Sequence, residues 1–498
     1  MSGSAYCAFL DRYHEIKALD SALDLMGWDR QVLMPPGGVE ARTAQSTILS
    51  RMVHELTTSD ETRRLLEKAE QEAEPGTDEA ASLRAFRRDL DIEAKLPTDL
   101  VTRKARVSGE AYEVWKKARA ESNFAAMKPY YDEVFEIARE TSQLLDPKAT
   151  HPYDPLIDMY EEGAKTADAT TMFEAIKQPI VDLVKDIVER GQDVPDAFMY
   201  GQWDVQALRA ASQEITEKIG FDYNRGRLDI APSAFCGGSS RGDIRMTTKP
   251  SEHVKGVLSS SLHEMGHGLY EQGSPEEWDQ TPLAGGISLA VHESQSRMWE
   301  NIIGRSRVFW THFLPVLQKH IPAMANLDVD TFCRGLNKVQ PSFIRVGADE
   351  LTYNLHILIR FELEVAIVTR AIETKDLPEA WNAKYTEYLG ITPPNDGAGV
   401  LQDVHWTRGS LGYFPTYSMG NLIGAQIWAA LDKDIPNRCD LIRAGEFKEV
   451  LGWLQEKIYK QGRRYKPKDL VQRVTGEPMN PKHWLEYATG KFSGIYGL

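Results

Sequence analysis

The sequence has few cysteines, and no two of them lie close together. Its 498 residues include four, Cys7, Cys236, Cys333 and Cys439, and none belongs to a CxxC pair of the kind that forms structural zinc sites. Their scarcity excludes a disulfide framework, so we expect four reduced thiols in a cytoplasmic protein. Cys236 lies in a glycine-rich stretch, where a reactive thiol is the alternative interpretation.

Basic charge and long apolar runs are also scarce. The chain has 58 lysines and arginines against 73 aspartates and glutamates, a net charge of -15, whereas a general nucleic-acid-binding protein needs a basic surface to neutralise phosphates. No stretch approaches the roughly 20 apolar residues of a membrane-spanning helix, and residues 1–10 lack the basic and apolar regions of a signal peptide. We therefore expect no nucleic-acid partner and no membrane span.

Amphipathic helical patterns fill most of the chain. Apolar residues recur every three or four positions in residues 10–28, and the pattern resumes at 40–56 after a Pro- and Gly-rich break. Charge-rich segments of the same kind are typical of the solvated faces of long helices. They lie at about 78–95, 98–120, 122–145 and 169–190. The sequence therefore predicts a mostly α-helical fold.

One region has the character of strands. Two short runs, 223–230 and 243–248, flank Gly237 and Gly238, so we expect a glycine-rich turn between two strands of a hairpin or small sheet. Neither an internal repeat nor an interdomain linker is visible. The simplest interpretation is a single domain over residues 1–498, with two helical subdomains as its variant.

The centre of the chain carries the pattern of a metal-binding helix. His263 and His267 stand four positions apart, so both imidazoles project from one helix face and can hold one ion, usually zinc, at about 2.0–2.1 Å. Glu264 is offset by about 100° around the helix axis and can act as general base for a water molecule at the metal. Ser251 is the expected N-cap and Gly273 the expected stop. The alternative is a pair of surface or core histidines without a metal.

Glu293 is the candidate third ligand. The intervening loop allows a second helix, about 287–303, to pack antiparallel to the first and bring this carboxylate to the ion. Glu271 is a rival, but it lies one turn too far along the first helix to complete a tetrahedron. It suits a supporting role. His292 is expected to be a supporting or structural residue, and Glu300 either supports the site or lies on the surface. Two histidines and a glutamate accommodate zinc, cobalt or manganese, of which zinc is the expected ion.

Further motifs follow one another along the chain. They are Leu-Met-Gly-Trp-Asp at 25–29, Asp-Ile-Arg-Met-Thr at 243–247, His-Glu-Met-Gly-His at 263–267, His-Glu-Ser-Gln-Ser at 292–296, Ile-Arg-Val-Gly-Ala-Asp at 344–349 and Gly-Val-Leu-Gln-Asp-Val-His-Trp at 399–406. On these motifs the sequence resembles the Taq-type thermostable metallocarboxypeptidases, metallopeptidase family thirty-two, over nearly its whole length. One motif departs: the family's His-Pro-Phe is replaced by Ser233-Ala234-Phe235, and we infer that this position tunes substrate preference.

The resemblance implies both a fold and an activity. The fold is a large, mostly α-helical domain with a long central substrate groove and a small β-sheet near the active site, assembled as a homodimer. The activity is that of a zinc metallocarboxypeptidase, which releases single residues from peptides with a free C-terminus and has a broad side-chain preference. Each chain would hold one divalent metal ion.

The resemblance also implies donors for the oxyanion of the transition state. In related zinc peptidases a histidine and a tyrosine that follow the metal helices supply them. His405 and Tyr413 match this arrangement here, with Tyr417 as the rival tyrosine. Such a donor contributes about 3–4 kcal/mol to transition-state stabilisation. The alternative for either tyrosine is packing within an aromatic-rich loop.

Recognition of a C-terminal carboxylate requires a fixed cation. A guanidinium suits this role because it binds a carboxylate through two parallel hydrogen bonds. Arg345, which is flanked by apolar residues, is the best candidate, and Arg245 is the next. The alternative for each is a buried ion pair with Asp349 or Asp403.

Two other functions are compatible with the metal motif. A zinc endo-oligopeptidase or dipeptidyl carboxypeptidase of the same clan would share it, but would not need the motifs at 344–349 and 399–406. A catalytically silent zinc-binding scaffold would not need Glu264 between the two histidines. We therefore expect a C-terminal exopeptidase.

Overall fold

The computed structural model describes residues 5–498, which are mostly helical with one small sheet. They form two compact units. The first consists of the chain up to Glu93, Pro195–Leu336 and Ile423–Pro478, and the second of Ala94–Val194, Asn337–Leu422 and Met479–Leu498. Each unit draws on three segments that are distant in the sequence, which explains why no linker is visible. The predicted fold class is confirmed, whereas the single-domain interpretation and the substrate groove stay predictions.

The helices of the first unit follow the predicted amphipathic segments and extend them. They are α1 (Ala5–Val32), α2 (Val39–Thr58), α3 (Asp60–Glu72), α4 (Asp78–Lys95), α9 (Val205–Ile219), α10 (Val254–Gln272), α11 (Leu289–Arg297), α12 (Arg307–His320), α13 (Val329–Leu336), α17 (Arg438–Ala444), α18 (Lys448–Lys457) and α19 (Pro467–Thr475). Buried side chains of α1, α3 and α4, among them Phe9, Leu66 and Phe86, form an N-terminal core. Phe9 and Phe86 meet edge to face, with 5.2 Å between ring centroids.

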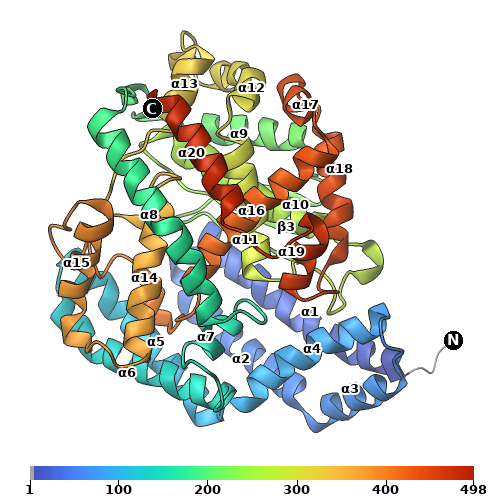
Figure 1. The fold of residues 1–498 in the computed structure, drawn as a ribbon. Helices are drawn as coiled ribbons and strands as arrows, with labels where there is room; N and C mark the ends of the chain where they lie inside the picture. The colour runs from blue at the N-terminus through green and yellow to red at the C-terminus, as the bar shows by residue number, and fades with distance from the viewer. Residues whose placement is uncertain (1–4) are drawn as a thin grey trace. The chain divides into compact units, whose positions relative to one another are not determined.

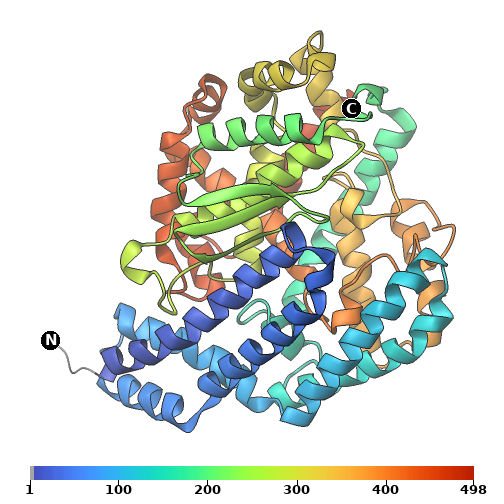
Figure 2. The same ribbon diagram turned by 180° about the vertical axis from the view of Figure 1, so that it is seen from behind.

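The sheet of the first unit contains β1 (Gly226–Ile230), β2 (Cys236–Ser240) and β3 (Asp243–Thr248) in the order β1-β3-β2. β3 pairs parallel with β1 and antiparallel with β2, and Figure 2 shows α9 beside β1 and α1 beside β2. The predicted sheet is confirmed, but the predicted turn at Gly237 and Gly238 is wrong, because both glycines lie within β2. A Cβ atom at Gly238 would lie 2.5 Å from the carbonyl oxygen of Asp243. The glycine therefore permits a close approach of two strands.

The helices of the second unit are α5 (Thr98–Ala120), α6 (Phe124–Leu145), α7 (Asp154–Asp158), α8 (Thr166–Arg190), α14 (Tyr353–Val368), α15 (Leu377–Leu389) and α20 (Lys482–Tyr496), while α16 (Phe414–Asp434) begins in this unit and ends in the first. Figure 1 shows α5 and α6 side by side. α14 is apolar and mostly buried, including two of its three charged residues, Arg360 and Glu364. Across residues 5–498, no helix combines the length and the apolar character of a membrane span.

Candidate functional site

The metal-binding motif lies on α10, against which β3 packs. The predicted N-cap, Ser251, is wrong by two positions because the backbone is still extended at His253. The His253 ring accepts a hydrogen bond from the backbone N–H of Lys255 at 3.0 Å and so caps the helix. The predicted end of the helix is confirmed, since Gly273 is its C-cap.

A second helix packs antiparallel to α10, as predicted. α11 begins after the N-cap Ser288, and a π-helical turn, Met298–Ile303, continues it to Gly304; such turns are frequent at functional sites. The two helices come close together at Gly266, where a Cβ atom would lie 2.6 Å from the Cα atom of Ser296. The absent side chain thus lets the carboxylate of the predicted third ligand reach the histidines.

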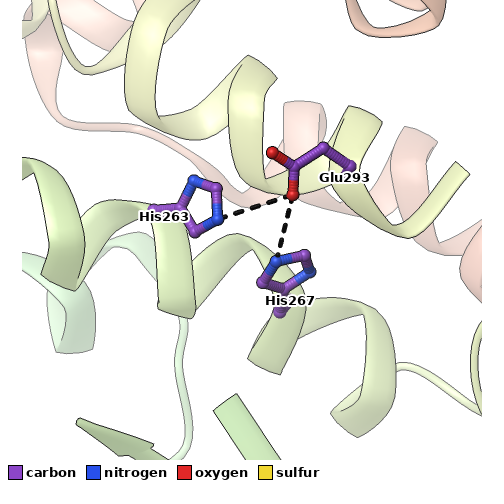
Figure 3. A group of neighbouring side chains, drawn as sticks. All are labelled: His263, His267 and Glu293. Atoms are coloured by element: carbon purple, nitrogen blue, oxygen red, sulfur yellow. Dashed lines mark ion pairs between the residues drawn. The ribbon is translucent and has the colours of Figure 1, made fainter. Parts of the chain in front are cut away.

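The three predicted metal ligands come together in the first unit. Nε2 of His263 and Nε2 of His267 each lie 3.5 Å from Oε2 of Glu293 (Figure 3). All three ligand atoms lie within 4.8 Å of one another. Tetrahedral ligands about 2.0–2.2 Å from one zinc ion are separated by about 3.4 Å. The residues present therefore fit one divalent metal ion.

Each ligand histidine is oriented through its other ring nitrogen. Nδ1 of His263 lies 3.0 Å from Oε2 of Glu300. Nδ1 of His267 lies 2.6 Å from Nδ1 of His292, whose Nε2 lies 2.6 Å from Oε1 of Glu271. If both ligand histidines donate from Nδ1, each presents the lone pair of Nε2 to a metal. Glu271, His292 and Glu300 thus lie behind the ligand histidines, where a supporting role would place them.

Arg297 links the carboxylates behind the ligands. Its Nε donates to Oε1 of Glu293 at 2.6 Å and its Nη1 to Oε2 of Glu300 at 3.2 Å, while Arg305 donates to Oε1 of Glu300 at 2.7 Å. Burial raises the pKa of both carboxyl groups, but these cations and the histidines outweigh it and hold each pKa below its ordinary range. Burial lowers the pKa of His267 to about 4. An ionised glutamate and a neutral histidine are the forms that bind a metal.

Glu264 lies beside these ligands on α10 and is 5% exposed. Burial raises its pKa to about 7, against the opposing effect of His263. A carboxylate that titrates near neutrality can both take and return a proton. Burial, reinforced by the charge of Glu264, also raises the pKa of the Cys236 thiol well above its ordinary value. This thiol is therefore protonated at neutral pH, which argues against the reactive-thiol alternative.

Arg245, the second candidate for carboxylate recognition, lies on β3 of the first unit. Its guanidinium forms a bidentate ion pair with Asp243, at 2.9 and 3.0 Å, and covers the ring of Trp28 at 4.3 Å. Its partner is therefore the aspartate of its own motif. In the segment that departs from the family, the hydroxyl of Ser233 donates to Oε1 of Gln31 at 3.2 Å.

Arg345 lies in the second unit and is paired with Asp403. Its Nε and Nη2 donate to Oδ1 of Asp403 at 2.9 and 2.8 Å, whereas Asp349 accepts backbone N–H groups of its own turn. Asp403 is shared, because Arg360 donates to its Oδ2 at 2.6 Å. Burial raises the pKa of Asp403, but the two guanidinium groups outweigh it and hold the pKa far below its ordinary range. Two buried cations thus share one carboxylate, which leaves an excess positive charge.

The predicted oxyanion donors belong to the same arginine cluster. Nε2 of His405 lies 3.2 Å from Oη of Tyr417, over whose ring Arg345 stands at 5.2 Å. The rings of His405 and Tyr413 are 5.5 Å apart, and those of the two tyrosines 5.3 Å apart. Burial lowers the pKa of His405 to about 3, so the ring is neutral. The aromatic packing considered for both tyrosines is present.

Sequence reasoning missed five residues in or beside these clusters, Arg305 among them. Arg297 follows Glu293 by four positions, the spacing of a helical ion pair, and could have been identified from it. Arg360 and Glu364 stand out as charges within the apolar run of α14, where burial demands partners. Gly266 gave no signal, because the backbone that it accommodates belongs to another helix.

The chain resembles known proteins along its whole length. The model of the family described as Carboxypeptidase Taq (M32) metallopeptidase matches residues 8–492. Thermostable carboxypeptidase 1 of Thermus thermophilus is 35% identical over 506 residues, 99% of each chain, and the protein of that name from Pyrococcus furiosus is 36% identical over 487 residues, 97% of each chain. The solved structure of the M32 carboxypeptidase from Deinococcus radiodurans has a TM-score of 0.96 and 32% identity, and 100% of each chain is covered.

Proposed function

Because the chain belongs to the Carboxypeptidase Taq (M32) metallopeptidase family, we propose that it removes single residues from the C-termini of peptides, with a broad side-chain preference. Membership of this family, predicted from the motifs, makes the protein a peptide-bond hydrolase that uses a divalent metal. The observation that carries the exopeptidase assignment is the excess positive charge of the cluster in which Arg345 and Arg360 share Asp403. A substrate carboxylate would neutralise that charge.

We propose that His263, His267 and Glu293 hold the metal, and that it is zinc, with cobalt or manganese as alternatives. When bound, such an ion supplies Lewis acidity, which polarises a carbonyl and lowers the pKa of water. One ion per chain is proposed because residues 5–498 offer one such group of ligands.

The chain's own residues would then move the protons and hold the developing charge. Glu264, buried and with a pKa of about 7, takes a proton from the attacking water and returns it to the leaving amine. The neutral ring of His405 donates an N–H to the oxyanion. Tyr413 is the first candidate for a second donor, and Tyr417 remains its rival.

Arg345 is the proposed anchor for the C-terminal carboxylate. The charge of its rival, Arg245, is matched one to one by Asp243, whereas Arg345 shares Asp403 with a second cation. In addition, Nη2 of Arg360 is buried and has no hydrogen-bond partner within residues 5–498. The cluster therefore retains an excess positive charge that a substrate carboxylate could balance.

A pair of peptides that differ only in a free or an amidated C-terminus tests the proposal. We expect stepwise loss of one residue from the free acid, and cleavage of the amide at least about 100-fold more slowly, because a site built for a charged group rejects an analogue that lacks it. Equal rates would contradict the assignment and favour the endo-oligopeptidase. Two-residue steps would favour the dipeptidyl carboxypeptidase, and metal binding without turnover the silent scaffold. Glu264→Gln, purified identically, controls for contaminating peptidases.

From the same resemblance we propose a homodimer in the cytoplasm. Sedimentation of the purified protein measures the first property, and fractionation of the source cells measures the second. A monomer at all concentrations tested would contradict the dimer without affecting the assigned reaction.

A further inference from the structure

Glu364 is a fully buried carboxylate for which the proposed reaction has no use. It lies on α14 with 0% exposure. It accepts three hydrogen bonds, from Oη of Tyr153 at 2.6 Å, from Nε1 of Trp406 at 2.8 Å and from the backbone N–H of Gly412 at 2.9 Å. A buried carboxylate in an apolar helix is unfavourable unless such partners compensate it.

Two of the three donors frame the loop that carries the proposed oxyanion donors. Trp406 directly follows His405, and Gly412 directly precedes Tyr413. Oε1 of Glu364 accepts from Trp406, and Oε2 accepts from Gly412. One side chain from a separate helix therefore fixes both ends of the loop 406–412.

The anchored loop has little freedom to shift. Gly412 has a φ of +94° and passes so close to α7 that a Cβ atom would lie 2.4 Å from the carbonyl oxygen of Leu156, so glycine is required there. At the same end, the ring of Tyr160 meets that of Tyr413 edge to face at 5.1 Å. At the other end, the indole of Trp406 packs edge-on against a buried tyrosine of α6 at 5.9 Å.

We propose that Glu364 is a positioning residue for the oxyanion donors: by accepting from Trp406 and Gly412 at once, it sets where His405 and Tyr413 stand. The proposal rests on the donor roles given above. Glu364 acts through the loop rather than on the substrate. Positioning of this kind matters because a displacement of about 1 Å can lower a rate about 100-fold.

The test compares Glu364→Gln with Glu362→Gln, a matched control on the same helix. Glutamine keeps the shape, but its amide nitrogen donates, so one loop donor would face another donor. In the control, Glu362 accepts from Lys384 and Tyr388 and has no bond to the loop. At pH 8, where Glu364 is ionised, we expect Glu364→Gln to lower kcat about 10- to 100-fold, with KM within about threefold of wild type and metal content unchanged. The control should keep the wild-type kcat.

A double-variant cycle separates positioning from general structural support. If Glu364 acts through the loop, Glu364→Gln should lower kcat less in a His405→Ala background than in wild type, because coupled residues are non-additive and only the positioning of Tyr413 is then left to lose. A wild-type kcat for Glu364→Gln, or losses that multiply in the double variant, would overturn the proposal while leaving the donor roles intact. Wild-type kcat for both His405→Ala and Tyr413→Phe would instead refute the donor roles, and the positioning proposal with them.

A second variant serves if Glu364→Gln does not fold. Tyr153 donates to the same carboxylate oxygen as Gly412, so Tyr153→Phe removes a restraint on the carboxylate and keeps the ring in place. We expect kcat to fall about fivefold at constant KM, as for the loss of one bond of about 1 kcal/mol. An unchanged kcat in this folded variant would count against positioning.

Discussion

The metal cluster of the first unit and the arginine cluster of the second are both buried, yet their charges are opposite. Around the two ligand histidines, carboxylates outnumber guanidinium groups. The carboxylates are Glu264, Glu271, Glu293 and Glu300, and the guanidinium groups are Arg297 and Arg305. In the arginine cluster the balance is reversed, because Arg345 and Arg360 share the single carboxylate of Asp403.

The difference in net charge indicates which kind of ligand each cluster would favour. An uncompensated buried charge is unfavourable, so a bound cation would stabilise the first cluster and a bound anion the second. A divalent metal meets the first requirement, and the C-terminal carboxylate of a peptide meets the second. The proposed metal ligands and base thus lie in one cluster and the proposed carboxylate anchor in the other, so single variants can disrupt these two roles independently.

The largest expected effect, on kcat, comes from a variant that changes only the first cluster. Glu264→Gln removes the proposed base but none of the metal ligands, so we expect kcat to fall about 1,000-fold at normal metal content and a KM close to wild type. Steady-state kinetics with metal analysis of the same sample measures this. Glu276→Gln, at an exposed carboxylate of the same unit, should be unaffected. Activity that survives both Glu264→Gln and chelation would mean that the reaction occurs elsewhere.

The next largest effect, on KM, comes from a variant that changes only the second cluster. Arg345→Ala should raise KM for free-acid peptides about 100-fold, since truncating one partner of a buried charge pair costs about 2–5 kcal/mol. Metal content should stay normal, and the slow cleavage of the amidated peptide should not change. Arg370→Ala, at an exposed pair, is the control. An unchanged KM would remove this role from Arg345, and the same measurement on Arg245→Ala would then test its rival.

A smaller effect, on metal affinity, distinguishes the ligands of the first cluster from the residues that orient them. His292→Ala removes the partner of His267 but no ligand, so we expect metal affinity to fall about 10- to 100-fold while KM for loaded enzyme stays constant. Competition with a chromophoric chelator gives the affinity, and circular dichroism checks the fold. His320→Ala, whose ring pairs with Glu214, is the matched control. Wild-type affinity in His292→Ala would show that the relay to Glu271 does not orient the ligand.

Much of the fold and the metal site follows from local patterns in the sequence. Helical periodicity gave the bounds of α4 and α5 to the residue or nearly so, because side-chain burial follows the helix repeat. The spacing of His263 and His267 fixes two ligands on one face for the same local reason. Glu293 required only the further assumption of an antiparallel neighbouring helix.

What the sequence did not reveal depends on partners from distant segments. The pairing of Arg345 with Asp403 was an alternative considered from the sequence, but nothing indicated that Arg360, 43 positions from Asp403, shares it, or that Trp406, 42 positions from Glu364, donates to that glutamate. No periodicity records such pairs. The turn predicted at the glycines of β2 was wrong for the same reason. Their composition suggests a turn, and only the contact with the neighbouring strand explains Gly238.

The smallest expected effect is on the pH dependence of folding stability, through Glu364, the carboxylate beside the second cluster. Burial raises the pKa of Glu364 to about 7 from an ordinary 4.5, against the hydrogen bonds from Gly412, Tyr153 and Trp406 and the charge of Arg360. Between these two pH values the folded protein keeps a proton that the unfolded chain has released. The folded state therefore loses stability as pH rises through this window, by about 3 kcal/mol in all.

Glutamine does not titrate, so Glu364→Gln should lack this dependence. For a chain of this length, about 3 kcal/mol corresponds to about 3 °C in Tm. Calorimetry of wild type and variant at pH 4.5, 6 and 8 and matched ionic strength should show the Tm difference moving by that amount in favour of the variant as pH rises. A difference that is constant with pH would mean that Glu364 stays ionised throughout, because the charge of Arg360 and the three donors fully offset its burial. An ionised Glu364 would add a negative charge beside Arg360. The excess positive charge of the arginine cluster would then be smaller, and so would the difference in charge between the two clusters.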